Sequence, residues 1–473
     1  MKYINSRGGL EPIEFSDTVL WGLGPRNGLL LPESFPKYSR KELLEMSQLD
    51  YKQLAFHIMK DFIDDIPDDD LKKIIDDTYN TQNFDSNDIT PLIQFDSDLY
   101  LLDLYEGPTR AFKDVALQFL GRTFDYILTK IDSTTNILTA TSGDTGSAAI
   151  YGIAGRPRLN ITVLTPKGKM SAFQTAQMYS VLEDNVHCIA VDGNFDDCQW
   201  MMEQVNEDVE FREKYRLGSM NSKNWARILA QIVYYGFSVL QVNKNPERNI
   251  DDEVDVVVPT GNFGNILAGY YARKIGFPIG NLILATNENN VLDEFFKTGI
   301  YRPRTDDNVF ATNSPSMDIA KASNFERYIY DIIGDPEKNY ELWVQASKNG
   351  FLDLSHNEYF NRVTDSRITS GMTFSSNRAE VIKRLHKDYG LIIDTHTANG
   401  VYVGLKEKRE NVPMVFLATA DPCKFEDTMK EILGNVEVKS PDKYLDLETR
   451  EQRYVEMKKD VPALKEYIRN NSI

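Results

Sequence analysis

The chain has 473 residues, of which 41% are hydrophobic, and this length allows two or three domains with their own cores. Its formal net charge is −18 at pH 7, which argues against nucleic acid or an acidic membrane surface as the main partner. A small anionic ligand stays compatible with this charge, because a few backbone amides or one arginine can bind a phosphate locally.

Cysteine and histidine are sparse and carry no metal-binding pattern. The three cysteines show no CxxC spacing, and the five histidines form no HExxH pair, so we predict neither a disulfide framework nor a metal site. The N-terminal residues lack an apolar signal region, and no apolar run approaches the ~20 residues needed to span a bilayer. These features predict a cytoplasmic protein without a membrane partner.

The chain divides into three parts by its sequence pattern. Residues 1–90 contain a turn-rich stretch at 22–36 and helical spacing with acidic faces at 41–79, which predicts an N-terminal domain. From residue 91 to 434 strand-like and helix-like segments alternate, which predicts an α/β architecture with parallel sheets. Residues 435–473 are charged with a helical pattern and are predicted to form a C-terminal helical extension.

Strands are predicted wherever short apolar, β-branched runs end in turn residues. These runs are residues 100–105, 137–140, 159–164, 186–191, 254–258, 282–286 and 414–417. Segments of helical length lie between them, among them residues 170–182 and 225–240. In parallel sheets ligands bind where strands end and the following loops begin, so these loops are where a functional site is expected.

The loop at residues 106–114, with the sequence EGPTRAFKD, places Lys113 in the first turn of a predicted helix. A helix N-terminus carries partial positive charge and favours acids, so a lysine there is unusual. If such an amine is also buried, its charged form is disfavoured and it becomes a better nucleophile at neutral pH. A solvated surface lysine is the alternative that this segment alone leaves open.

Three further loops follow predicted strands. Residues 141–147 (TSGDTGS) are small enough for backbone amides to converge on a carboxylate or phosphate, although a capped helix entry would explain them equally. Residues 259–265 (PTGNFGN) match neither GxGxxG nor a P-loop, and their two glycines favour a single phosphate over a structural turn. Residues 417–425 (LATADPCKF) place Thr419 at a strand end, which by itself is ordinary.

In chain order these segments resemble the threonine synthase family, pyridoxal-phosphate enzymes of the tryptophan-synthase-β fold type. The matching motifs are EGPTRAFKD, TSGDTGSAA, NSKNWARILAQ, VPTGNFGNILAGYYARK, ATNENN, SPSMDI, DTHTANGV and ATADPCKFED. The resemblance covers nearly the whole chain and implies pyridoxal 5'-phosphate as the cofactor. It also implies fold type II: two parallel-sheet α/β domains with a cleft between them, plus the N-terminal domain. A smaller mobile part is expected at about residues 120–220.

The resemblance implies roles for residues that match the family's motifs. Lys113 matches the lysine that binds the cofactor covalently and then acts as general base and acid. The residues that match the loop around the cofactor phosphate are Gly261, Asn262, Phe263 and Asn265. The residues that match contacts to the cofactor ring are Thr419, at the pyridine nitrogen, and Asp144, near the phenolic oxygen.

Substrate contacts are implied in the same way. The residues that match the loop for the substrate's α-carboxylate are Ser142 and Thr145. The residues proposed for a second anion site, which would hold the substrate phosphate, are Ser222, Asn224 and Arg227. The guanidinium fork of Arg227 suits two phosphate oxygens, while an ion pair on a helix surface is the alternative.

Five residues depart from the family's pattern: Arg110, Lys223, Thr395, Asp421 and Cys423. None of them replaces a group that does chemistry, but Arg110 and Lys223 could change how the substrate phosphate is held. The substrate is therefore less firmly implied than the cofactor.

The implied reaction converts O-phospho-L-homoserine and water to L-threonine and phosphate. A phosphohomoserine lyase that gives 2-oxobutyrate, or a serine/threonine dehydratase of the same fold, stays open as an alternative. So does a non-catalytic protein that binds pyridoxal phosphate, although the intact Lys113 argues against it. We expect a monomer or a homodimer.

Overall fold

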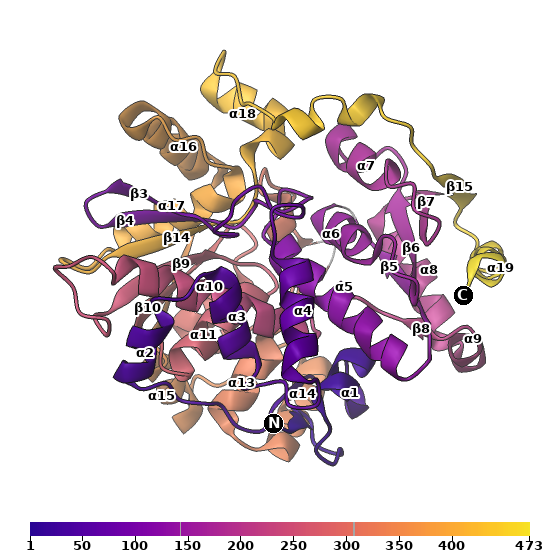
Figure 1. Ribbon diagram of the computed structural model, residues 1–473, viewed down its shortest axis with the longest axis horizontal. Helices are drawn as coiled ribbons and strands as arrows, with labels where there is room; N and C mark the ends of the chain where they lie inside the picture. Colours follow the sequence, from indigo (N-terminus) through magenta and orange to yellow (C-terminus); the bar gives the residue numbers. More distant parts are fainter. Residues whose placement is uncertain (142, 306–307) are drawn as a thin grey trace.

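The computed structural model describes residues 1–141, 143–305 and 308–473, and it contains two large sheets surrounded by helices (Figure 1). The strands of the larger sheet are β3 (Leu92–Asp96), β4 (Leu99–Asp103), β9 (Val254–Pro259), β10 (Ile279–Thr286), β13 (Ile368–Met372) and β14 (Met414–Ala418). Their order is β13-β10-β9-β14-β4-β3. Neighbouring strands are parallel except β3 and β4, which form an antiparallel edge.

The strands of the smaller sheet are β5 (Thr135–Ala140), β6 (Leu159–Pro166), β7 (Val186–Asp192), β8 (Leu217–Gly218) and β15 (Val455–Lys458). Their order is β15-β7-β6-β5-β8, and every pair is parallel. The central strand β6 is buried along its whole length, as expected of a parallel strand covered on both faces. The strands predicted between residues 137 and 417 all lie within observed strands.

Helices cover both sheets. The helices around the smaller sheet are α5 (Lys113–Lys130), α6 (Asp144–Ile153), α7 (Ala172–Tyr179), α8 (Phe195–Glu207) and α9 (Val209–Lys214). Those that follow or precede strands of the larger sheet are α11 (Gly264–Lys274), α12 (Val291–Thr298), α16 (Ser375–Tyr389) and α17 (Thr395–Lys406). A peripheral group consists of β11 (Ile300–Tyr301), α13 (Phe325–Ile333), α14 (Pro336–Asn349), β12 (Leu352–Asp353) and α15 (Glu358–Asp365). Within the described ranges, no helix has both the length and the apolar character required to cross a membrane.

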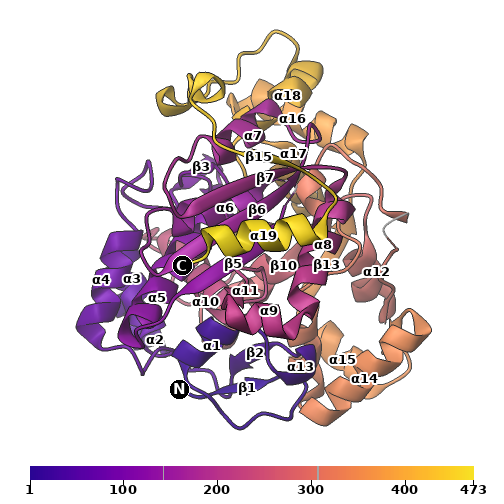
Figure 2. The ribbon, with the colours of Figure 1, turned by 90° about the vertical axis from the view of Figure 1, so that its right-hand side faces the viewer.

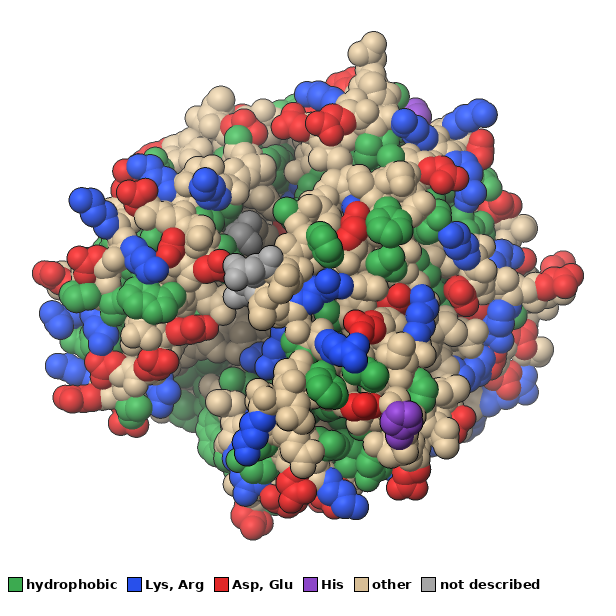
Figure 3. All heavy atoms as spheres, turned by 180° about the vertical axis from the view of Figure 1, so that it is seen from behind, with side chains coloured by type: hydrophobic (Ala, Val, Ile, Leu, Met, Phe, Trp, Pro, Cys, Tyr) green, Lys and Arg blue, Asp and Glu red, His purple; other side chains and the backbone are tan. Residues whose placement is uncertain are grey.

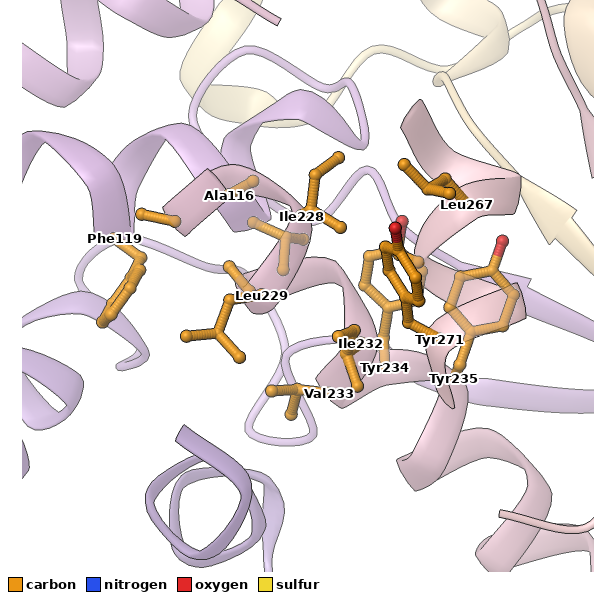
Figure 4. Close-up of a cluster of buried hydrophobic side chains, with 14 of the residues drawn as sticks. Ala116, Phe119, Ile228, Leu229, Ile232, Val233, Tyr234, Tyr235, Leu267 and Tyr271 are labelled. Carbon is orange, nitrogen blue, oxygen red and sulfur yellow. The ribbon is translucent and has the colours of Figure 1, made fainter. Parts of the chain in front are cut away.

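The helix α10 (Trp225–Val242) is the centre of the molecule, and all its residues except Gln241 are buried. A helix that is apolar on every side must be covered on every side. Figure 4 shows this arrangement, with α5 contributing Ala116 and Phe119 on one flank and α11 contributing Leu267 and Tyr271 on the other. The helix α10 is thereby packed between α5 and α11.

The N-terminal residues brace this central helix. Their elements are β1 (Tyr3–Asn5), α1 (Phe15–Trp21), β2 (Leu30–Pro32), α2 (Arg40–Met46), α3 (Tyr51–Met59) and α4 (Asp68–Thr78). A capping box between Asp50 and Gln53 starts α3, which packs on α10, while α4 packs on α5. We propose that residues 1–90 act as a supporting domain for the helices that carry the site.

The last part of the chain passes from the larger sheet to the smaller one (Figure 2). After the 3-10 helix η4 (Pro422–Phe425) and α18 (Glu426–Leu433), strand β15 joins the edge of β7, and α19 (Val461–Asn471) packs on α8. The sequence analysis predicted only helix in this part. Strand β15 has mostly exposed residues, so no apolar alternation marks it in the sequence.

Candidate active site

Lys113 is the first residue of α5, which confirms its predicted place in the first turn of a helix. The next residue, Asp114, fixes the preceding loop, because its carboxylate accepts hydrogen bonds from the Thr109 N–H at 2.7 Å and the Thr109 hydroxyl at 2.8 Å. A Cβ at Gly107 would lie only 2.4 Å from the Asp114 Cβ, so glycine is required for this close approach.

The Lys113 side chain is only 11% exposed and faces charged groups from three other segments. Its Nζ lies 3.5 Å from Asp144 Oδ2 at the start of α6. Burial lowers the pKa of Lys113 below its ordinary value, Asp144 opposes this, and the positive charges of Arg227 and Lys424 lower the pKa further. The amine therefore loses its proton more readily than a surface lysine, as a nucleophile or base requires.

Asp144 is the only carboxylate within ion-pair distance of Lys113 among the described residues. Lys424 Nζ lies 2.6 Å from Asp144 Oδ1, and the Ser316 hydroxyl donates to Oδ2 at 3.2 Å. Burial raises the pKa of Asp144, but the charges of Lys424 and Lys113 outweigh it and hold the pKa well below its usual range. Asp144 is therefore ionised. The sequence analysis quoted the motifs that contain Lys424 and Ser316 but assigned neither residue to the site.

The turn between β9 and α11 has unused hydrogen-bond donors. Phe263, with a φ of 65° in the left-handed region, leads into α11. The backbone N–H groups of residues 262–266 donate no hydrogen bond within the described parts of the chain. A Cβ at Gly261 would lie 2.7 Å from Ile319 Cγ1, so a neighbouring loop covers this turn closely. Free amides that converge at a helix N-terminus form an anion-binding site.

Two tyrosines fix the side chain of Asn265 in the first turn of α11. The hydroxyls of Tyr234 and Tyr235 donate to Asn265 Oδ1 at 2.6 Å and 2.9 Å. Burial raises the pKa of both tyrosines well above its ordinary value, so both keep the proton that they donate. The Asn265 Nδ2 is buried and has no partner among the described residues, so it adds a further donor to the turn.

Thr419 lies directly after β14, and backbone hydrogen bonds connect it to the loop of Lys113. The Phe112 N–H donates to the Thr419 carbonyl at 2.9 Å, and the Thr419 N–H donates to Thr397 Oγ1 at 3.2 Å. Thr419 is buried. No hydrogen bond joins its hydroxyl to the described residues, which leaves this hydroxyl for a ligand.

A buried Asp394–His396 pair supports the loop that carries Ser316. The Ser316 N–H donates to His396 Nε2 at 3.1 Å, so the proton of this imidazole lies on Nδ1 and is donated to Asp394 Oδ1 at 2.8 Å. Asp394 also accepts hydrogen bonds from the N–H and hydroxyl of Thr397 at the start of α17. One network therefore connects Ser316 with the backbone of Thr419. The sequence analysis assigned no role to His396, because a single histidine has no local signal.

Seen from behind, the surface is hollowed near its centre, with lysine and arginine side chains beside the hollow (Figure 3).

Comparisons with known proteins agree with the site's composition. Residues 2–79 match the family described as threonine synthase N terminus, residues 75–342 match pyridoxal-phosphate dependent enzyme, and residues 397–468 match threonine synthase, C-terminal.

The chain is 47% identical over 476 residues to the threonine synthase of Methylobacillus glycogenes, with 99% of each chain covered. It is 41% identical to that of Corynebacterium glutamicum, with 99% of this chain and 98% of the other covered. Among solved structures it is similar to the pyridoxal-phosphate-bound threonine synthase from Brucella melitensis, with a TM-score of 0.94, 36% identity and coverage of 100% and 99%. For the yeast threonine synthase the TM-score is 0.93, with 35% identity and coverage of 99% and 98%.

The chain belongs to the threonine synthase family. The expected fold class, with two parallel-sheet α/β parts and an N-terminal domain, is confirmed, and the cofactor is pyridoxal phosphate. The residues present fit this cofactor. The amides of residues 262–266 and the Asn265 Nδ2, which have no partner among the described residues, are donors suited to its phosphate. The amine of Lys113, with its lowered pKa, is suited to bind its aldehyde.

Two of the residues that the threonine synthase motifs predicted for the substrate, Thr145 and Arg227, lie in the first turns of α6 and α10. Thr145 follows Asp144 in the first turn of α6, whereas Ser142 lies outside the described residues. Arg227, in the first turn of α10, is 4% exposed, and its Nη1 has no partner among the described residues. Burial lowers the pKa of Arg227 to about 10. The alternative of a surface ion pair is therefore wrong for this arginine.

Ser222 and Asn224 lie just before α10 and have contacts within the protein. The Asn224 side chain caps α10 by accepting from the Ala226 N–H at 3.1 Å and also donates to the Val19 carbonyl at 2.9 Å. The hydroxyls of Ser222 and Ser323 are 2.8 Å apart. Asn224 thus positions the start of α10, and the Ser222 hydroxyl retains hydrogen-bonding capacity for a ligand.

Two departures from the threonine synthase pattern are partners of each other. Arg110 donates to Asp421 Oδ2 from Nε at 2.9 Å and from Nη2 at 2.6 Å, and its Nη1 donates to Asp85 at 2.9 Å. The Asp421 N–H in turn donates to the Arg110 carbonyl at 3.1 Å. This pair fastens the loop before Lys113 to the loop after Thr419.

The other three departures lie in different surroundings. The Lys223 amine has no ion-pair partner among the described residues, and burial together with Lys321 lowers its pKa. The Thr395 hydroxyl donates to the Asn313 carbonyl at 2.6 Å. Burial raises the pKa of the Cys423 thiol to about 12, so this cysteine is an unreactive core residue.

Proposed function

We propose that the protein converts O-phospho-L-homoserine and water to L-threonine and phosphate, as a carbon–oxygen lyase that acts on phosphates. The observation that carries this proposal is the pairing of a buried amine, Lys113, with a buried guanidinium, Arg227, whose charge reaches that amine. A phosphorylated amino-acid substrate requires both groups: a base at its α-carbon and a permanent cation for its phosphate.

Lys113 is the proposed base and acid. When bound, pyridoxal phosphate supplies an electron sink that acidifies the bond to the substrate's α-hydrogen. Because burial lowers the pKa of Lys113, its amine can accept that proton near neutral pH and return one later in the reaction. The same amine binds the cofactor aldehyde before the substrate arrives and after the product leaves.

The turn after β9 is the proposed cradle for the cofactor phosphate. The backbone amides of Asn262 and Phe263 and the Asn265 Nδ2 offer donors, and Gly261 leaves no room for a side chain where Ile319 covers the turn. Thr419 is proposed to meet the pyridine nitrogen with its hydroxyl. A hydroxyl there does not force the nitrogen to stay protonated, unlike a carboxylate.

Asp144 is proposed to face the cofactor's phenolic oxygen. A carboxylate can lie there because two neighbouring cations, Lys424 and Lys113, balance its negative charge. Two like charges would otherwise repel each other in a buried site.

Ser142 and Thr145 are proposed to hold the substrate's α-carboxylate. Thr145 lies in the first turn of α6, where the helix dipole favours an anion. Arg227 and Ser222 are proposed to hold the substrate's phosphate, and Asn224 contributes by fixing the N-terminus of α10. The departing phosphate can stay on Arg227 during the addition of water, because this guanidinium has an unpartnered donor.

A reaction that adds one water at a fixed step must exclude other water before it. We propose that the smaller part, at about residues 120–220, closes over the cofactor when substrate binds. Asp144 supports this proposal, because it belongs to α6 and contacts Ser316 and Lys424, which both lie outside the smaller part.

One assay tests the proposed function and its alternatives together. The purified protein is scanned for the absorbance of covalently bound pyridoxal phosphate and then receives O-phospho-L-homoserine. Equal amounts of phosphate and threonine support the proposal, whereas phosphate with 2-oxobutyrate would assign a lyase. Absence of both the absorbance band and any product would leave a protein without the proposed chemistry.

We also propose that the protein acts in the cytoplasm as a monomer or a homodimer. The sparse cysteines support a reducing compartment, and all three are buried thiols in the structure. Size-exclusion chromatography with light scattering tests the oligomeric state.

A further inference from the structure

Lys424 is a second buried lysine in the site, and so far its only role in the proposed reaction is to balance the charge of Asp144. Its side chain is fully buried, and it comes from η4 after the larger sheet. Its Nζ donates to the Thr109 carbonyl at 2.7 Å and lies 2.6 Å from Asp144 Oδ1. It therefore joins three chain segments around Lys113: the loop before α5, the start of α6 and the segment after β14.

The two lysines share Asp144 unequally. Lys424 approaches one carboxylate oxygen to 2.6 Å, whereas Lys113 stays 3.5 Å from the other, which also accepts a hydrogen bond from Ser316. A buried carboxylate interacts most strongly with the nearer cation. Lys424 thereby neutralises most of the negative charge of Asp144. Without Lys424, this charge would stabilise the ammonium form of Lys113.

We propose that Lys424 is a positioning residue for the reaction: it holds the Asp144 carboxylate and leaves the Lys113 amine free to bind the cofactor and carry protons. The proposal rests on the function proposed for Lys113. It assigns to Lys424 an effect on the protonation of Lys113 that a purely structural tie between loops would not have.

The charges that face these groups agree with this assignment. Lys113 faces Asp144 on α6, Arg227 on α10 and Lys424 on η4. Asp144 faces the two lysines and, more weakly, His396 on α17. Of these charges only Asp144 favours the ammonium form of Lys113, so the cation that neutralises Asp144 decides how strongly that form is favoured.

The test compares three full-length variants with the wild-type protein: Lys424→Met, Asp144→Asn and the double variant. Two pH profiles are measured, the rate at which the chain takes up pyridoxal phosphate, followed by absorbance, and kcat for phosphate release. In Lys424→Met the unshared Asp144 favours the Lys113 ammonium, so the acidic limb of both profiles should move to higher pH by about one unit. Removing Asp144 as well should return the limb to the wild-type position or below it.

A structural role alone predicts a different result. It would lower both rates equally at every pH, and adding Asp144→Asn to Lys424→Met would not restore the wild-type pH profile. An unshifted limb in Lys424→Met therefore overturns the proposal. If Lys424→Met does not fold, the double variant, which lacks both charges, still tests the proposal. An acidic limb at higher pH than in the wild-type protein would contradict the proposed role of Asp144.

A control on the neighbouring α18 is Lys430→Met. Lys430 is exposed and, among the residues that the structure describes, pairs only with Glu426 one turn away. Its replacement should therefore leave both profiles in place. Failure of the proposed function looks different from failure of this inference. In the first case the wild-type protein takes up no cofactor and forms no threonine, whereas in the second it does both and Lys424→Met shows no shift.

Discussion

Replacing Arg227 with methionine should make the protein more stable and nearly inactive. Arg227 is buried, and its Nη1 has no hydrogen-bond partner within the described parts of the chain. The folded protein therefore holds a charge that water would solvate better. The pKa of Arg227 falls from 12.5 to about 10 because of burial. At about 1.4 kcal/mol per pKa unit this corresponds to about 3 kcal/mol of lost stability at pH 7.

The sign follows from proton linkage. A base whose pKa is lower in the folded state destabilises that state at every pH where it is charged, and the effect vanishes only above the unfolded pKa. Methionine is an unbranched apolar side chain that can fill much of the same space. Arg227→Met is therefore expected to raise the free energy of unfolding at pH 7 by up to about 3 kcal/mol, measured by urea unfolding with excess pyridoxal phosphate.

The same change should remove most of the activity. A guanidinium that donates two hydrogen bonds to a phosphate contributes about 1.5–3 kcal/mol through each, so kcat/KM for O-phospho-L-homoserine should fall about 10²- to 10⁴-fold. Phosphate release at low substrate concentration measures this loss. A variant that is both less stable and fully active would refute the reasoning, since Arg227 would then be a structural residue.

Arg327→Met is the matched control for stability. Arg327 is also fully buried and also has a pKa lowered to about 10, mainly by burial. Unlike Arg227, it donates to the Leu30 carbonyl at 2.8 and 2.9 Å, to Asn324 Oδ1 at 2.7 Å and to the Lys223 carbonyl. Arg327→Met leaves these acceptors unpaired and should destabilise the protein by about 2–4 kcal/mol.

Three further predictions concern the loop of Lys113 and the closure of the site. Lys113→Ala should lose the absorbance of covalently bound cofactor and about 10³-fold or more in kcat, and activity near the wild-type level would contradict the mechanism. Arg110→Leu leaves the buried Asp421 carboxylate without its cation and should lower the free energy of unfolding, measured in urea, by about 3–5 kcal/mol. The double variant Arg110→Leu, Asp421→His should recover most of this loss. A substrate analogue should slow hydrogen exchange at residues 141–147, and identical exchange with and without the analogue would argue against closure.

The features that could be predicted from the sequence are those with a local cause. The strands on either side of the site are short β-branched runs, and glycine or threonine at their ends marks the loops that follow. Lys113 is recognisable because its position at a helix start is unfavourable without a function. The anion site after β9 follows from two glycines at a strand-to-helix turn, and the free amides of residues 262–266 give that prediction its physical basis.

The groups that sequence reasoning missed act through contacts between distant segments. Ser316 reaches Asp144 across 172 residues, and no spacing within either motif indicates this. Lys424 lies in a 3-10 helix beyond the strand that carries Thr419, so its direction depends on how the chain leaves the larger sheet. Strand β15 was missed for a related reason, because a mostly exposed edge strand pairs through its backbone and has no apolar pattern.

Arg110 and Asp421 show how such contacts change the meaning of single residues. Each is an isolated departure from the family's pattern, and Arg110 even adopts a φ of 56°, which a bulky side chain rarely does. In the structure they are 311 residues apart and form one buried ion pair. Without Arg110, the Asp421 carboxylate would be buried without a cation at a large cost in stability, whereas Arg110 without Asp421 would keep only Asp85 and Glu106. Because each charge neutralises the other, the pair can replace uncharged groups without moving the backbone that positions Lys113 and Thr419. Arg110 is therefore not needed to bind the substrate phosphate, which is the role proposed for Arg227.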